Sequence, residues 1–328
     1  MTPSSLLFFS TTTMGTLMVL SSNNWLLLWM GMELNLLSFV PLIASSQLFQ
    51  ETEASVKYFI IQAIGSGVML MAGVMSMSAP SSALMKHTTS LMFLLSMVVK
   101  LGMAPCHQWL PHVMSSMSWL MCLVLSTWQK VSPLMMLNTI TPHNITAYIT
   151  FIAMASAIVG GLGGANQSQM RALLAYSSIG HMGWMLMAIQ FSSSIFSLYF
   201  MTYLIITSSL MLMMFNVSSF NSNFNSNIAQ MSYISFAMMM IMMFSLGGLP
   251  PFLGFLPKWM IINTMTAKEM FLILITLITG SLLNLFYYFS MLFNFITMMK
   301  TCSNSAPTPG ANLILTSLCT LTPLMLYL

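Results

Sequence analysis

Long apolar segments follow one another along almost the whole chain, and this feature limits the possible folds more than any other. A membrane-spanning helix needs about 20 mostly apolar residues, and about eleven such segments can be identified. Of the 328 residues, 8 are Lys or Arg, 4 are Asp or Glu, and 57% are hydrophobic. So few charges cannot cover a water-soluble surface of this size, and a disordered chain has a much lower apolar content. The sequence therefore predicts an all-α, polytopic membrane protein.

The connections between the apolar segments are short and rich in Ser, Asn, Thr and Pro, as at 219–227 and 301–310. None is long enough for a soluble domain, so we expect one transmembrane domain over residues 1–328. The predicted spans are 6–20, 25–44, 56–77, 91–117, 119–137, 145–165, 172–189, 195–217, 234–262, 270–298 and 313–328.

Two of these spans contain prolines and glycines that prevent a single straight helix. KLGMAPCHQWLP lies in the span 91–117, and SLGGLPPFLGFLPKW lies in the span 234–262. Proline lacks the N–H group that a helix needs and clashes with the preceding turn. In a bilayer, the freed backbone groups must line a cavity or be covered by protein. We therefore expect two broken helices.

The two interruptions also resemble each other in sequence. Leu101-Gly102 followed by Pro105 matches Leu246-Gly247 followed by Pro250, and a Leu-Pro pair comes after each. The segments lie five spans apart and so cross the membrane in opposite directions, as in an inverted repeat. We expect five-helix halves at about 25–165 and 172–298, with peripheral helices at 1–20 and 313–328. Chance is the alternative, because Leu, Gly and Pro are common in membrane helices.

Four charged residues lie inside predicted spans: one acid, Glu33, and three lysines, Lys100, Lys130 and Lys258. Each charge at a helix centre costs about 2.5–3.5 kcal/mol on insertion scales, so such residues are functional candidates. Burial disfavours a charged lysine and a nearby carboxylate favours it, so a row of lysines can act as a proton relay under electrostatic control. Alternatively, Glu33 and Lys100 form a static buried pair that holds the helices together.

His181 is the one histidine in the middle of an uninterrupted predicted span, and it is a candidate relay member or a packing residue. A bis-histidine haem needs two histidines at this depth on two helices, so a single one argues against a cytochrome. The chain has no GxGxxG motif, no P-loop and no cluster with metal-ligand spacing. We therefore expect no cofactor in this chain, and the thinly spread positive charge argues against nucleic acid as a partner.

Five strings together resemble a known family: MGMELNLLSFVPLI, KLGMAPCHQWLPHV, STWQKVSPL, QMRALLAYSSIGHMGWML and SLGGLPPFLGFLPKW. They are similar to the antiporter-like membrane subunits of mitochondrial NADH–ubiquinone oxidoreductase (complex I) and to Mrp-type sodium/proton antiporters. Lys258 at the second break and the number of spans resemble the animal subunit 2 family. The 40 methionines are also similar to animal proteins encoded in mitochondrial DNA.

This resemblance implies a multi-pass protein of the mitochondrial inner membrane that translocates protons while other subunits carry out NADH oxidation and ubiquinone reduction. It implies that Glu33 and Lys100 are a controlling ion pair, Lys130 the central lysine and Lys258 the distal lysine. His181 would link the two halves. The implied partners are other membrane-arm subunits and phospholipids such as cardiolipin. FMN, iron–sulfur clusters, NADH and ubiquinone would bind to other subunits.

Two other functions fit the same residues. One is a stand-alone Mrp-type sodium/proton antiporter. The other is a structural spacer subunit without its own proton path, in which the buried charges only fix how the helices pack.

Overall fold

The computed structural model describes residues 3–46, 48–78, 83–140, 145–218 and 233–300. All regular structure in these ranges is helical. The first helices are α1 (Pro3–Ser21), α2 (Trp25–Ile43), the short 3₁₀ turn η1 (Ala44–Ser46), α3 (Phe49–Ser78), α4 (Ala83–Leu101), α5 (Trp109–Ser116), α6 (Trp119–Ser126) and α7 (Trp128–Ile140). They are followed by α8 (Thr146–Ala165), α9 (Met170–Phe191), α10 (Ser193–Ser218), α12 (Tyr233–Gly247), α13 (Phe255–Ala267) and α14 (Phe271–Lys300).

The described helices account for ten of the eleven predicted spans. Within the described ranges, eight helical segments are long and apolar enough to cross a membrane. The predicted spans 91–117 and 234–262 are each divided, the first into α4 and α5 and the second into α12 and α13. The last predicted span, 313–328, lies outside the described residues. The all-helical, polytopic fold with two broken helices is thus confirmed.

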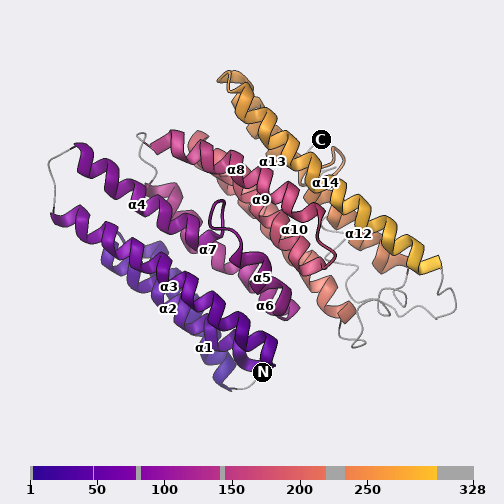
Figure 1. Cartoon of the computed structure of the whole chain (residues 1–328), viewed down its shortest axis with the longest axis horizontal. Coiled ribbons are helices and arrows are strands. Elements are labelled where there is room, and N and C mark those ends of the chain that lie inside the picture. The colour runs from indigo at the N-terminus through magenta and orange to yellow at the C-terminus, as the bar shows by residue number, and fades with distance from the viewer. Residues whose placement is uncertain (1–2, 47, 79–82, 141–144, 219–232, 301–328) are drawn as a thin grey trace.

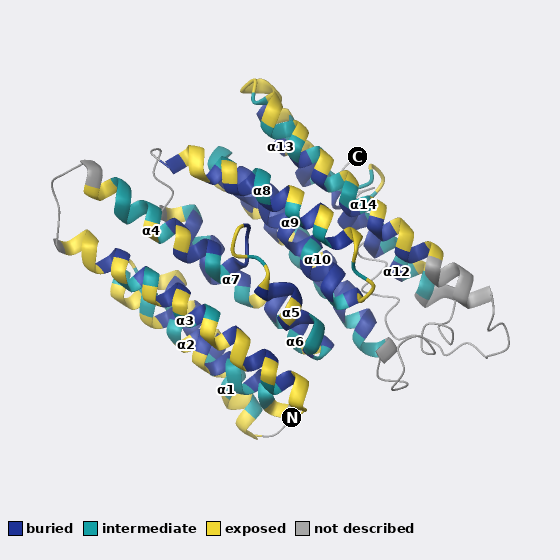
Figure 2. Ribbon diagram, viewed as in Figure 1, coloured by how far each residue is buried: buried dark blue, intermediate teal, exposed yellow. Residues whose placement is uncertain are grey.

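The helices lie side by side in a slab that runs from the N-terminal helices α1–α3 to the C-terminal helices α12–α14 (Figure 1). Helix α9 lies in the interior, packed against α8, α5, α10 and α14, and nearly all of it is buried (Figure 2). The outer helices α1, α3 and α14 expose apolar residues such as Leu17, Ile64 and Leu282. Such an outer surface suits lipid or neighbouring membrane proteins rather than water.

The two broken helices end in the same way. The breaks occupy 102–108 and 248–254, and each begins with a glycine of positive φ, Gly102 at 68° and Gly248 at 80°. The next residue's N–H then bonds back to the helix, from Met103 to Val98 O at 3.1 Å and from Leu249 to Phe244 O at 3.4 Å. This is the Schellman pattern, in which a left-handed residue ends the helix. The two broken helices run in opposite directions (Figure 1).

The structure moves the correspondence between the two breaks by one residue. The sequence match paired Gly102 with Gly247, whereas the structurally equivalent glycine is Gly248. Gly102 and Gly248 are 146 positions apart (248 − 102), as are Leu110 and Leu256 (256 − 110). A single offset of 146 residues therefore relates the first and last residues of the two breaks. The sequence match needed two offsets, 145 at Gly247 (247 − 102) and 146 at Leu256 (256 − 110).

A third interruption was not predicted. The predicted span 119–137 is divided at Thr127 into α6 and α7. The Thr127 hydroxyl donates to Leu123 O at 2.6 Å, and the Ser126 hydroxyl donates to the same oxygen at 3.2 Å. Ser and Thr side chains that bond to their own helix in this way bend it. The interruption lies three residues before Lys130.

Candidate functional site

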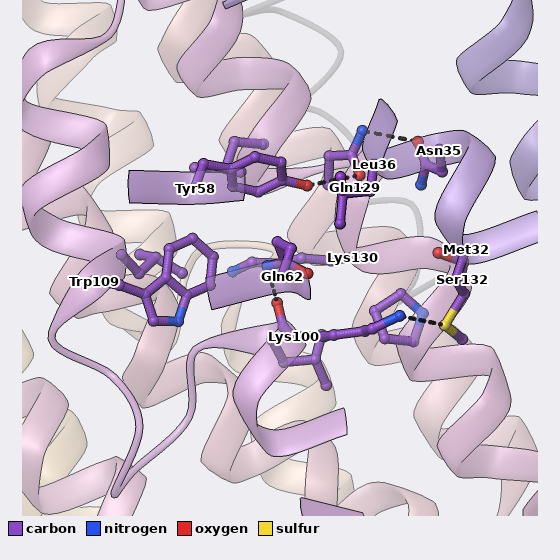
Figure 3. Close-up of a pocket in the computed structure, with 14 residues that line it drawn as sticks. Met32, Asn35, Leu36, Tyr58, Gln62, Lys100, Trp109, Gln129, Lys130 and Ser132 are labelled. Carbon is purple, nitrogen blue, oxygen red and sulfur yellow. Dashed lines mark hydrogen bonds between the residues drawn. The ribbon is translucent and has the colours of Figure 1, made fainter. Parts of the chain in front are cut away.

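Lys100 lies in the last turn of α4, next to the first break. Its ammonium lies 3.3 Å from the Met32 sulfur on α2, and its carbonyl accepts a hydrogen bond from Gln62 Nε2 on α3 at 3.1 Å (Figure 3). These contacts hold the lysine between three helices. Lys100 was predicted from its charge inside an apolar span, whereas Met32 and Gln62 were not predicted.

The expected direct ion pair between Glu33 and Lys100 is not formed. Within the described ranges, the only carboxylate within 4.0 Å of a lysine nitrogen is Glu53, next to Lys57 on the surface of α3. Adjacent residues on a helix point about 100° apart, so Met32 faces Lys100 and Glu33 turns aside, half-buried. The charge of Glu33 still acts on Lys100 through space.

A small cavity joins Lys100 to Lys130. Its volume is about 30 Å³, which gives room for about two water molecules. Polar side chains from α2, α3 and α7 line it together with the two lysines, so water held there would have hydrogen-bond partners (Figure 3). The polar lining residues are Asn35, Tyr58, Gln62, Lys100, Gln129, Lys130 and Ser132.

Three of these side chains form a hydrogen-bonded row along the cavity. Gln129 Nε2 donates to Asn35 Oδ1 at 2.9 Å, and the Tyr58 hydroxyl donates to Gln129 Oε1 at 3.4 Å. Asn35 and Gln129 stand next to functional candidates in the sequence, two residues after Glu33 and one before Lys130. Their polar character inside apolar spans was the signal that could have identified them.

Lys130 lies in the first turn of α7 and is only 3% exposed. Its ammonium lies 3.3 Å from the Tyr203 hydroxyl oxygen on α10 and 5.3 Å from the centre of that ring. Both contacts favour the charged form over a bare apolar site, because the oxygen accepts a hydrogen bond and the ring face is electronegative. Tyr203 was not predicted as a partner of Lys130 from the sequence.

His181 lies in the middle of α9 and is buried. Its Nδ1 atom lies 2.9 Å from the Tyr199 hydroxyl, and its ring centre lies 5.4 Å from that of Tyr203. Its other ring nitrogen, Nε2, is buried and has no hydrogen-bond partner within the described part of the chain. Tyr199 and Tyr203 are four residues apart and therefore share one face of α10. The four-residue spacing could have predicted that Tyr199 and Tyr203 lie on the same face of α10. It could not have predicted that this face packs against His181.

Lys258 lies in the first turn of α13, directly after the second break. It is 5% exposed, so it does not extend to a polar interface. Its ammonium donates to Gly247 O at 2.8 Å and to Leu246 O at 3.4 Å, and it lies 6.0 Å from the Trp184 ring centre. The lysine therefore caps the C-terminal end of α12, where a positive charge is favoured.

The structure brings the predicted residues together unequally. Lys100 and Lys130 share one cavity, and Tyr203 lies between Lys130 and His181. In the described part of the chain, no hydrogen bond joins Lys258 to His181, because the Lys258 ammonium donates to Gly247 O and Leu246 O instead. The described residues also contain no group of three His, Cys, Asp or Glu side chains that could hold a metal ion.

Comparison with known proteins places the chain in a family. Residues 22–284 match the family described as NADH:quinone oxidoreductase/Mrp antiporter, TM. The NADH-ubiquinone oxidoreductase chain 2 of Lumbricus terrestris is 42% identical over 291 residues, which make up 88% of this chain and 86% of that protein. Chain 2 of Locusta migratoria is 38% identical over 90% of this chain and 86% of its own length.

Solved structures show the same fold at lower identity. A chain of respiratory complex I from Thermus thermophilus, solved with bound aureothin, matches with a TM-score of 0.79 at 21% identity, covering 99% of this chain and 79% of that one. A chain of the membrane-bound sulfane sulfur reductase, an archaeal respiratory membrane complex, matches at 0.84 and 16% identity, covering 98% and 72%. The chain therefore belongs to the NADH:quinone oxidoreductase/Mrp antiporter transmembrane family, and within it to the NADH-ubiquinone oxidoreductase chain 2 proteins of animals.

Proposed function

We propose that this chain is a proton-translocating subunit in the membrane arm of a mitochondrial NADH–ubiquinone oxidoreductase, embedded in the inner membrane. The observation that carries the proposal is the interior arrangement of Lys100, Lys130 and His181. The two lysines line one polar cavity, and a single tyrosine separates Lys130 from the histidine. Buried ionisable groups of this kind mark ion pathways in membrane proteins. The 42% identity to a chain 2 protein supports the same function.

In this proposal the five predicted residues form one relay. Lys100 and Lys130 each hold or release a proton, and the water-sized cavity between them passes it on. His181 receives the proton from Lys130 through the region of Tyr203. Lys258 is the last proton carrier of the relay, at its distal end. Glu33 controls Lys100 by its charge, across a distance rather than through a direct ion pair. The five-helix halves at 25–165 and 172–298 remain part of the proposal.

The chain is a subunit of an enzyme, the proton-translocating NADH:ubiquinone reductase. We expect it to have no redox site of its own. FMN, the iron–sulfur clusters, NADH and ubiquinone would bind to other subunits. The exposed apolar faces of α1, α3 and α14 suit contacts with other membrane-arm subunits and with phospholipids, cardiolipin included.

The test is substitution of Lys130 by methionine in the assembled complex. Lys130→Met keeps an unbranched apolar side chain but cannot carry a proton. We expect proton pumping and coupled quinone reduction to fall while the amount of assembled complex stays nearly constant. Glu33→Gln should act in the same direction. Lys57→Met is the matched control, because the side chain of Lys57 is 50% exposed and its loss should change neither quantity.

Unchanged pumping stoichiometry in both Lys130→Met and Glu33→Gln would exclude the proposal. If assembly falls first and pumping falls only in proportion to it, the chain is a structural spacer.

A stand-alone sodium/proton antiporter is the second candidate, because the matched family includes Mrp antiporters. A chain of the Mrp complex from Dietzia matches with a TM-score of 0.75, but at only 16% identity. Isolation of the protein from its native membrane separates the candidates. Migration with a large assembly that oxidises NADH supports the complex I subunit, and migration without one supports the antiporter.

A further inference from the structure

The break between α6 and α7 leaves the Ser126 carbonyl without its usual partner in the helix. In a continuous α-helix the N–H of Lys130 would donate to the carbonyl four residues earlier, that of Ser126. Here it donates to Thr127 O at 3.3 Å. The Ser126 carbonyl is buried in an apolar interior, where an unpaired polar group is costly.

Tyr203 on α10 fills this vacancy. Its hydroxyl donates to Ser126 O at 3.3 Å, and the hydroxyl oxygen of Tyr203 itself accepts a hydrogen bond from the Lys130 ammonium at 3.3 Å. A phenol has one donor and two acceptor sites, so both bonds can exist together. The ring also lies 5.3 Å from the ammonium. One side chain therefore pairs the carbonyl freed by the helix break and holds the lysine beside it.

The same face of α10 continues to His181. Tyr199, one turn before Tyr203, lies with its hydroxyl 2.9 Å from His181 Nδ1, and the Tyr203 ring centre lies 5.4 Å from that of the histidine. Tyr203 thus lies between Lys130 on α7 and His181 on α9, and Tyr199 on the same helix face contacts the histidine.

We propose that Tyr203 is a positioning residue that holds Lys130 at the α6–α7 break, facing His181, in both protonation states of the lysine. This inference rests on the proposed function. While Lys130 is an ammonium, Tyr203 accepts from it and donates to Ser126 O. Once Lys130 has given up a proton, its nitrogen has a lone pair, and the phenolic hydrogen turns from Ser126 O to that nitrogen. The tyrosine keeps its own proton throughout, and only hydrogen bonds exchange.

The test is Tyr203→Phe in the assembled complex reconstituted into phospholipid vesicles. This change removes the hydroxyl and keeps the ring that packs against His181. We expect the rate of proton pumping per assembled complex to fall about tenfold, a typical effect of losing one hydrogen bond to a charged group. The pH at which pumping is half-maximal should also move. The titratable groups that face Lys130 are Tyr203 on α10, His181 on α9, and Lys100 and Tyr58 across the cavity.

Two further variants make the result decisive. Tyr148→Phe removes the hydroxyl of an exposed tyrosine on α8 and should change neither the rate nor the pH profile. Tyr203→His keeps a ring with polar atoms and should recover part of the rate that Tyr203→Phe loses. Such recovery would not follow from a purely structural role.

The inference is overturned if Tyr203→Phe pumps at the parent rate per assembled complex with the parent pH profile. It is also overturned if this variant lowers only the amount of assembled complex. If Lys130→Met abolishes pumping in the same experiment, either result rejects only the role of Tyr203, and the proposed function stands. If Lys130→Met pumps normally, the proposed function fails as well.

Discussion

The ammonium of Lys130 lies 3.3 Å from the hydroxyl oxygen of Tyr203, on the opposite side of a helix break from the Ser126 carbonyl that the same hydroxyl contacts. The contact joins α7 to α10, and its two residues, Lys130 and Tyr203, are 73 positions apart in the chain. It places Lys130 between the polar cavity shared with Lys100 and the buried His181. Lys100, Lys130 and His181 therefore lie in one polar region of the interior.

Filling the cavity should interrupt this region. Leu36 on α2 lines the cavity and is buried, and Leu36→Phe would occupy space for about two water molecules. We expect proton pumping per assembled complex to fall several-fold, with a loss of stability of about 1–3 kcal/mol from overpacking. Pumping is measured by the acidification of vesicles. Leu37→Phe is the control, because Leu37 is 56% exposed on the same helix. Full pumping by Leu36→Phe would show that protons do not cross this cavity.

The first broken helix should depend on the left-handed conformation of Gly102. Its φ of 68° is unfavourable for any residue with a side chain, and a Cβ atom there would lie 2.9 Å from Leu110 Cδ1. Gly102→Ala should therefore destabilise the fold by about 1–3 kcal/mol. Thermal denaturation of the purified complex, followed through this subunit, measures the change.

Gly67→Ala is the matched comparison for this prediction. Gly67 lies inside α3, and apart from the neighbouring backbone of its own helix no atom lies within 4 Å of the position of its added Cβ. Alanine is about 0.5–1 kcal/mol more favourable than glycine inside a helix, so this variant should be as stable as the parent or more stable. Equal stability of Gly102→Ala and Gly67→Ala would contradict the role of the left-handed glycine.

Lys258 should matter for both stability and pumping. Lys258→Met removes the donor to Gly247 O and leaves a buried carbonyl unpaired, at a cost of about 1–3 kcal/mol. We expect a lower denaturation temperature and, if Lys258 is the distal proton carrier of the proposed relay, reduced pumping per assembled complex. Lys268→Met, at an exposed residue near the end of α13, should change neither by a comparable amount. If the Lys258→Met variant is destabilised but pumps normally, Lys258 only caps α12 and carries no proton.

The sequence predicted the fold class well because the relevant signal is local. Each span is recognised by its run of about 20 apolar residues. The two breaks are recognised by the proline and glycine residues within such runs. The break at Thr127 was missed, since it depends on hydroxyl groups that bond to the backbone and carries no glycine. The correspondence between the other two breaks was displaced by one residue, because either glycine of Gly247-Gly248 fits the sequence pattern.

The candidate site was predicted only in part. A charge inside an apolar span is visible in the sequence, which is why Glu33, Lys100, Lys130, Lys258 and His181 were selected. Their partners are ordinary residues in membrane helices. Tyr203, Gln62 and Met32 gain meaning only from the side chain that faces them on another helix. The expected Glu33–Lys100 pair was wrong as a direct contact, because helix rotation directs Met32 to the lysine.

By itself the sequence determined that the chain is a helical membrane protein, where two helices must break and which charges lie inside it. These properties follow from the hydration cost of each residue along a single helix. The tertiary structure alone decided which groups meet: Lys100 and Lys130 at one cavity, and Lys130 and His181 on either side of Tyr203. Contacts between helices depend on their rotation and packing, and a change of about 100° in the direction of one side chain exchanges one partner for another.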